Sequence, residues 1–232
     1  MGLLLEMPEL GIATQAFEPE TIDAAAPERS GRLGGVTLGN PVWRARWTLS
    51  RNLTRDASDE WRAFFARLRN AQRPFVAHDR DRLYPRAYSQ GFARMTRIDG
   101  TPFTGAATSW SQAVDGDSEA RLTLGGLPAG MKLGRGDYIG FRWDAAGSPA
   151  GAHDRRTLVR TVLPAMVSGN GTVSVLVEPP VPTLVVPAAA EAHLDRPGCI
   201  MKLVRGDSSL NPMDRRLKIA GGTVSAMQDL RP

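Results

Sequence analysis

Three histidines and a single cysteine are the side chains of this sequence most suited to metal binding or nucleophilic chemistry. Their spacing argues against both. His78 stands beside Asp79 and Asp81 in a charged run typical of a solvated turn, and His193 and Cys199 lack a second ligand pair of zinc-site spacing. The apolar neighbours of Cys199 predict a buried structural thiol. The sequence therefore predicts no metal site and no cofactor.

Sequence signatures of catalysis are also missing. The chain has no nucleophile elbow, no phosphate-binding P-loop and no His-Glu-x-x-His pair. Residues 134–136 read Gly-Arg-Gly but precede a predicted strand, which indicates a turn rather than a dinucleotide site. Arg-Gly-Asp occurs at residues 135–137 and 205–207, and we interpret both as turns rather than adhesion motifs. The sequence predicts a protein that is not an enzyme, and an enzyme with an unrecognised site is the least favoured alternative.

Length and composition predict a globular chain of one large or two small domains. Of 232 residues, 42% are hydrophobic and 23% are charged, close to the average of folded proteins. The first residues lack the basic and apolar regions of a signal peptide. The most apolar later stretch, residues 181–190, is interrupted by Pro182 and Pro187 and is too short for a bilayer. We therefore expect no membrane anchor, and assembly in a cytoplasm.

Charge is distributed unevenly along the chain. The formal net charge is +5, with 26 arginines and only 3 lysines. Residues 44–97 carry a net charge of +8, whereas residues 1–43 carry −4. Such a basic block is typical of nucleic-acid-binding surfaces and, when rich in arginine, of protein interfaces. Because it has neither zinc-finger spacing nor an RNA-binding aromatic motif, we favour the interface, and a basic nucleic-acid-binding β-protein stays an alternative.

The clearest strand is predicted at residues 42–50. Hydrophobic and polar residues alternate there, and period two is the signature of a strand with one buried face. The inward-facing set is Trp43, Ala45, Trp47 and Leu49, and the outward-facing set includes Arg44 and Arg46. The strand therefore presents two arginines to solvent or to a partner.

One amphipathic helix is predicted over residues 57–72, capped by Asp56 or Ser58 and ended by Pro74. Four apolar residues recur with helical spacing on one face and are expected to anchor the helix in a core: Trp61, Phe64, Phe65 and Leu68. A short strand at residues 75–77 and a polar loop follow. The predicted motif is strand, capped helix, strand.

Beyond residue 100 the sequence predicts short strands separated by turns that contain Gly and Pro. The expected strands are residues 121–124, 137–143, 157–167, 172–177, 199–204, 217–220 and 223–227. Because the last strands are too few to fold alone, residues 1–105 and 193–232 are expected to form one domain, with residues 106–192 inserted as a second. The predicted fold class is mainly β: a β-sandwich domain with one amphipathic helix, plus a small inserted β-barrel, OB-like or sandwich domain.

Four segments carry a resemblance to a known family. Residues 61–75 have the form W-x-x-F-x-x-x-L-R, followed by a short strand and a loop with Asp and Pro. Residues 133–138 match L-x-x-G-D-Y, residues 175–180 match V-x-(I/V)-E-P-P, and residues 194–197 read Leu-Asp-Arg-Pro. In their order, over about residues 36–204, they resemble distal tail proteins of long-tailed (siphovirus-like) bacteriophages and related gene-transfer particles.

The resemblance implies a structural protein of the virion. Such proteins form a hexameric ring of β-sandwich belt domains at the distal end of the tail tube, and the ring joins the tube to the hub. The partners implied are other copies of this chain, the tail tube protein, hub or tail-tip proteins, the tape-measure protein and tail fibres, with DNA only in transit through the lumen. The place implied is the tail tip, after assembly in the host cytoplasm.

A ring of this kind needs a head-to-tail interface that repeats around an axis. The sequence offers a basic and an acidic stretch as complementary halves: Arg44, Arg46, Arg51 and Arg55 of one subunit against Glu18, Glu20, Asp23 and Glu28 of the next. A solvated strand face is the competing interpretation of these arginines. Another tail-tip component, such as a hub or tail-terminator protein, is the alternative function.

Overall fold

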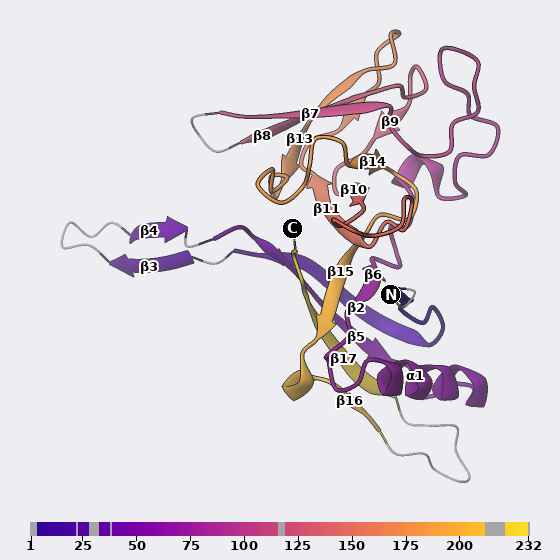
Figure 1. The fold of residues 1–232 in the computed structure, drawn as a ribbon, viewed down its shortest axis with the longest axis vertical. Coiled ribbons are helices and arrows are strands. Elements are labelled where there is room, and N and C mark those ends of the chain that lie inside the picture. The colour runs from indigo at the N-terminus through magenta and orange to yellow at the C-terminus, as the bar shows by residue number, and fades with distance from the viewer. Residues whose placement is uncertain are drawn as a thin grey trace. The chain divides into compact units, whose positions relative to one another are not determined.

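The computed structural model describes residues 4–21, 23–27, 33–37, 39–115, 119–211 and 221–231. The fold is mainly β and sandwich-like, with several sheets and one α-helix among the described residues (Figure 1), which confirms the predicted fold class. The chain divides into two compact units. The helix unit comprises residues 6–75 and 201–229, and the barrel unit comprises residues 1–5, 76–200 and 230–232. Within the described ranges, no helix has the length and apolar character needed to cross a bilayer.

The N-terminal half contains β1 (Leu5–Glu6), β2 (Ile12–Glu20), β3 (Asp23–Pro27), β4 (Leu33–Thr37), β5 (Val42–Leu49), α1 (Arg55–Arg67), β6 (Phe75–His78), the short 3-10 helix η1 (Arg86–Tyr88) and β7 (Ser109–Val114). The remainder contains β8 (Ala120–Gly125), β9 (Lys132–Leu133), β10 (Tyr138–Trp143), β11 (Arg155–Thr161), β12 (Ala165–Met166), β13 (Val173–Glu178), β14 (Glu191–His193), β15 (Gly198–Leu203), η2 (Arg205–Asp207), β16 (Ser209–Leu210) and β17 (Gly222–Gln228).

Strand β5 lies inside the antiparallel sheet of the helix unit, between β17 and β2, and β17 pairs in turn with β15 and β16. The predicted alternation is confirmed: Trp43, Ala45, Trp47 and Leu49 are buried, and the residues between them are exposed. Phe17 of β2 packs on the same face, with its ring centroid 5.5 Å from Trp43 and 6.3 Å from Trp47. The tryptophans therefore anchor the core of this unit.

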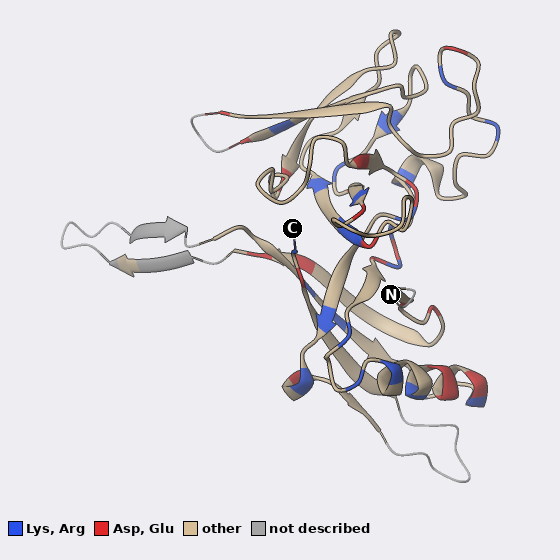
Figure 2. Cartoon of the chain, viewed as in Figure 1, with Lys and Arg blue, Asp and Glu red and all other residues tan. Residues whose placement is uncertain are grey.

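Helix α1 begins two residues earlier than predicted. Its N-cap is Thr54, not Asp56 or Ser58, because the Thr54 hydroxyl accepts a hydrogen bond from the Ala57 amide at 3.3 Å. Asp56 lies in the first turn and Arg67 in the last, so both side chains complement the helix dipole. Figure 2 shows acidic residues toward one end of α1 and basic residues at both ends.

The predicted C-terminal end of the helix, residue 72, is also wrong. Residues 69–71 adopt positive φ angles of 47°, 57° and 69°, and the Arg73 amide bonds to the Leu68 carbonyl, so the chain turns away after Leu68. The apolar stripe ends at Leu68, and no packing favours a further helical turn. Trp61, Phe64 and Leu68 are buried as predicted, whereas Phe65 is only half-buried beside the Phe64 ring.

Loss of the N-cap is expected to destabilise the helix unit. Replacing Thr54 with alanine leaves the Ala57 amide without its side-chain acceptor, and we expect the free energy of unfolding to fall by about 1 kcal/mol. Urea denaturation followed by circular dichroism measures the change. Asp56→Ala is the matched control, because it removes only a dipole interaction of a few tenths of a kcal/mol. A larger loss in the control than in Thr54→Ala would contradict the assignment.

The barrel unit contains a six-stranded antiparallel sheet of order β14-β10-β11-β13-β8-β7. Main-chain and side-chain bonds join its two ends: the Ala107 amide donates to the Ala192 carbonyl at 2.8 Å, and the Trp110 indole donates to the Ala190 carbonyl at 2.8 Å. The sheet therefore curls round on itself, and Ile139, Phe141 and other apolar side chains fill the interior. The predicted inserted β-domain takes the barrel form.

The predicted domain boundaries at residues 106 and 192 differ from the observed ones, which lie near residues 76 and 200. The reason is packing: Phe92 and Phe103, which the sequence assigned to the first domain, belong to the buried cluster of the barrel unit. The predicted strand 157–167 is divided into β11 and β12, since Pro164 interrupts it. The predicted strand 217–220 lies outside the described residues.

Candidate functional site

The predicted interface residues lie on two paired strands and the start of the helix. Arg44 and Arg46 project from the exposed face of β5, opposite Glu18 and Ala16 of β2 in the antiparallel register. Arg44 Nη1 lies 3.1 Å from both carboxylate oxygens of Glu20 in the same chain. The ion pair predicted between subunits is thus formed within one subunit for Arg44 and Glu20, because strand pairing makes them diagonal neighbours on β5 and β2.

The other predicted interface residues are exposed. Arg46, Arg51 and Arg55 make no ion pair within the described ranges of the chain. Arg51 stands in the turn after β5, and Arg55 is the first residue of α1. Glu28 and the side chain of Asp23 lie outside the described residues. The structure therefore leaves three arginines in solvent beside one satisfied pair.

Strand β2 is the last strand of the order β1-β6-β15-β17-β5-β2, so its outer edge has no strand partner within the described part of the sheet. Only Phe17 of its nine residues is buried. The register then continues from Glu20 and Val42 into the β3–β4 hairpin, where Asp23 pairs with Thr37. Strand β2 therefore forms an exposed edge beside β5, and β3 and β4 pair with each other as a separate two-stranded sheet.

His78 and Asp79 contradict the predicted solvated turn, because both are buried. The Nδ1 atom of His78 lies 3.0 Å from the Pro197 carbonyl, and Asp79 accepts hydrogen bonds from the Tyr138 hydroxyl at 2.9 Å and the Asp81 amide at 2.9 Å. In the sequence, Tyr138 lies 59 residues from Asp79, and Pro197 lies 119 residues from His78. His78 and Asp79 therefore anchor the loop to the barrel, whereas Asp81 is exposed.

His193 is a second buried histidine. Its Nδ1 atom lies 2.8 Å from the Asp195 carbonyl, a geometry in which Nδ1–H donates, and Nε2 has no partner within the described part of the chain. Burial, reinforced by the Arg142 charge, lowers the pKa of His193 to about 3. The ring is therefore neutral at neutral pH.

The Cys199 thiol is fully buried, which raises its pKa far above the usual range and confirms the structural role predicted for it. Among the described residues no cluster of three or more His, Cys, Asp or Glu side chains is arranged to hold a metal ion.

The first Arg-Gly-Asp segment forms a tight turn whose aspartate faces inward. Asp137 is 0% exposed, and its carboxylate accepts hydrogen bonds from the Gly134 amide at 2.6 Å and the Arg86 amide at 3.0 Å. A buried carboxylate cannot be presented to an adhesion receptor. Asp137 instead ties the 134–137 turn to the segment that enters η1.

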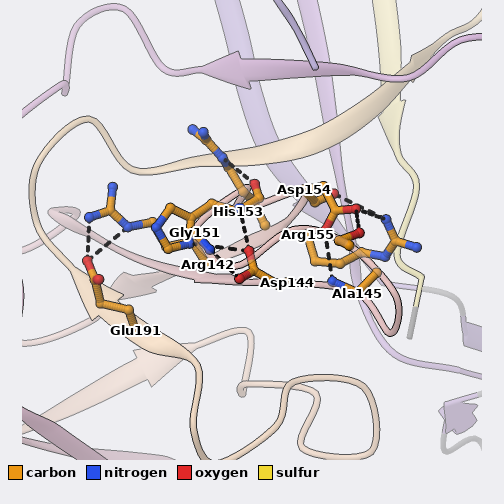
Figure 3. Close-up of polar contacts among 10 residues, drawn as sticks. Arg142, Asp144, Ala145, Gly151, His153, Asp154, Arg155 and Glu191 are labelled. Carbon is orange, nitrogen blue, oxygen red and sulfur yellow. Dashed lines mark hydrogen bonds and ion pairs between the residues drawn. The ribbon is translucent and has the colours of Figure 1, made fainter. Parts of the chain in front are cut away.

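Figure 3 shows the loop between β10 and β11, which contains two carboxylates that the sequence analysis did not single out. Asp144 accepts hydrogen bonds from the Gly151 and His153 amides, at 2.7 and 2.6 Å. Asp154 accepts hydrogen bonds from the Ala145 amide at 2.8 Å and from a serine hydroxyl. Each oxygen of the two carboxylates accepts a hydrogen bond from within the loop, so both side chains hold the loop in shape.

The pKa of Asp154 reflects this arrangement. Partial burial acts to raise it, but the Ser148 hydroxyl, the Ala145 amide and the Arg155 charge together lower the pKa of Asp154 below its usual value. Nearby, Arg142 and Glu191 form a cross-strand ion pair between β10 and β14. This ion pair links the start of the loop to β14.

Comparison with known protein families finds no family that matches this chain, and a search of curated proteins finds no match.

Proposed function

We propose that this chain is the subunit of a hexameric ring at the distal end of a phage-like tail tube, joining the tube to the hub or tail tip. The observation that carries the proposal is that two of the segments that resemble the family contain residues that hold the fold together. Trp61, Phe64 and Leu68 of the first segment are the buried face of the helix, and Asp137 of the second holds the turn before β10.

The exposed edge of β2 supports a ring in physical terms. An unpaired edge strand is a template for another strand, and native proteins cover such edges or use them for association. Pairing β2 of one copy with a different edge of the next copy gives a head-to-tail interface, which closes into a ring when the rotation fits. Strand β5, which pairs with β2, also carries Arg46 on its exposed face.

Electron microscopy of the purified full chain tests the proposal. We expect rings with six-fold symmetry, and light scattering coupled to size exclusion should give a mass of six chains. Three-fold particles would favour the alternative of a hub component. A chain that remains a monomer at every concentration, with and without a tail tube protein, would contradict the proposal.

Charge reversal at Arg46 tests the predicted interface. Because Arg46 has no ion pair of its own in the described chain, Arg46→Glu should leave the fold intact and weaken each subunit contact by up to about 1 kcal/mol, an effect that repeats around the ring. Arg121→Glu makes the same charge change on the exposed face of β8 and serves as the control. The fraction of rings at equal protein concentration is the measurement. Equal assembly of both variants would remove Arg46 from the interface.

A further inference from the structure

Two hollows of the barrel unit share one side chain, Arg86. The first, of about 470 Å³, is lined by residues 80–89, including Arg80, Arg82 and Arg86. The second, of about 550 Å³, is lined by Arg86 with Lys132 and a set of mostly apolar residues. Because Arg86 lines both, a cationic pocket and an apolar groove lie next to each other.

Internal hydrogen bonds hold the cationic pocket in shape. Arg82 lies across the 134–136 turn, where Nη1 donates to the Arg135 carbonyl at 3.3 Å, and Gly136 leaves room for its guanidinium. A Cβ atom on Gly136 would come within 2.4 Å of Arg82 Nη1, and the φ of +80° also favours glycine. The Arg86 amide is held by Asp137, while its side chain is exposed. Asp81 is the one carboxylate in the lining, against three guanidinium groups.

The groove beside it is formed by the short β9–β12 ribbon and η1. Leu133, Pro164, Ala165, Met166 and Ala87 line it. The register pairs Ala165 with Leu133 and Met166 with Lys132, and the Tyr88 hydroxyl accepts a hydrogen bond from the Lys132 amide at 3.0 Å. These bonds fix the walls of the groove in the free chain.

Three large apolar side chains near the groove are in contact with solvent. Val162, Leu163 and Met166 are 36%, 49% and 64% exposed, and they fall within five consecutive residues. A cluster of exposed apolar residues beside a concentration of positive charge is the mark of a binding surface rather than of a solvated face.

We propose that this composite surface binds an acidic peptide segment of a protein partner, one that places apolar side chains in the groove and carboxylates against Arg82 and Arg86. Charge complementarity selects this occupant. Guanidinium groups bind carboxylates with two parallel hydrogen bonds, and an apolar groove next to them excludes water from those bonds. A purely anionic ligand would leave the apolar groove empty, and a purely apolar ligand would make no use of the guanidinium groups. The proposal does not depend on ring formation.

Fluorescence anisotropy with the full chain tests it. The probe is a fluorescein-labelled peptide of repeating Glu-Leu-Ser, compared with Lys-Leu-Ser and Glu-Ser-Ser peptides of equal length. We expect saturable binding of the first peptide only. Arg86→Glu should weaken it about tenfold or more, and Met166→Ser roughly threefold to tenfold.

Two matched variants control for charge and for surface hydrophobicity. Arg121→Glu changes an exposed arginine elsewhere in the barrel unit, and Leu184→Ser removes a leucine that is 95% exposed. Both should bind like the unmodified chain, and all four variants should keep its melting temperature. Equal binding of the Glu-Ser-Ser peptide, full displacement by inorganic phosphate, or absence of Glu-Leu-Ser binding would each overturn the proposal, the first two in favour of a plain anion site.

Discussion

Replacing Asp137 with alanine is expected to lower the free energy of unfolding by roughly 2–5 kcal/mol, a large part of the stability of a typical domain. The side chain is fully buried, and its two oxygens accept hydrogen bonds from the Gly134 and Arg86 amides. Alanine leaves both amides, whose hydrogen bonds are partly buried, without their acceptor, and each such group costs about 1–3 kcal/mol. The loss arises in the turn that precedes β10, so the whole barrel unit is affected.

Urea denaturation measures this effect, with two comparisons. Asp137→Asn keeps one oxygen acceptor but turns an N–H toward the second amide. We therefore expect it to lower the free energy of unfolding by more than a surface substitution does. Asp81→Ala, at an exposed aspartate three residues after the end of β6, should change the stability by less than about 0.5 kcal/mol. A loss below about 1 kcal/mol in Asp137→Ala would mean that the turn does not depend on the carboxylate.

Acidification is expected to destabilise the protein through His193. The pKa of this buried ring is lowered from 6.5 to about 3 in the folded chain, so between these values the unfolded chain binds a proton that the folded chain does not. Stability from His193 is fully present above pH 6.5 and is lost as the pH falls toward 3. The linkage amounts to about 1.4 kcal/mol per pH unit, or about 2 kcal/mol between pH 6.5 and 4.5.

Comparison with a variant that does not titrate isolates this contribution. His193→Asn places an amide N–H near the position of Nδ1–H, within reach of the Asp195 carbonyl, and carries no ionisable group. Urea melts at several pH values should show a steeper loss of stability in the unmodified chain than in His193→Asn between pH 6.5 and 4.5. Parallel pH profiles would show that His193 takes up its proton without unfolding.

The elements that could be predicted from the sequence are those that bury one face, because their hydrophobic residues then recur at a regular spacing. Strand β5 and helix α1 were found because Trp43, Trp47, Trp61 and Phe64 recur with the period of the element that buries them. Strand β2 was missed because an edge strand with only Phe17 buried has no alternation to detect. Periodicity thus locates a buried face well and an edge poorly.

Polar contacts between distant segments were beyond prediction. His78 and Asp79 belong to a charged run, and only the fold brings Pro197 and Tyr138 to them. The charges of Arg44 and Glu20 were correctly seen as complementary, but one chain cannot reveal from its sequence whether such a pair closes within a subunit or between two. The Arg86 surface was missed for the same reason, since its two hollows combine residues 80–89 with residues 132–134 and 164–166.

The sealed position of Cys199 has a consequence for how the protein responds to its surroundings. It is the only cysteine of the chain, and no part of its side chain reaches solvent. Oxidants, reductants and thiol reagents therefore cannot reach this sulfur while the fold is closed. No disulfide can link folded copies of the chain, so any association between them is held by non-covalent forces and depends on their concentration.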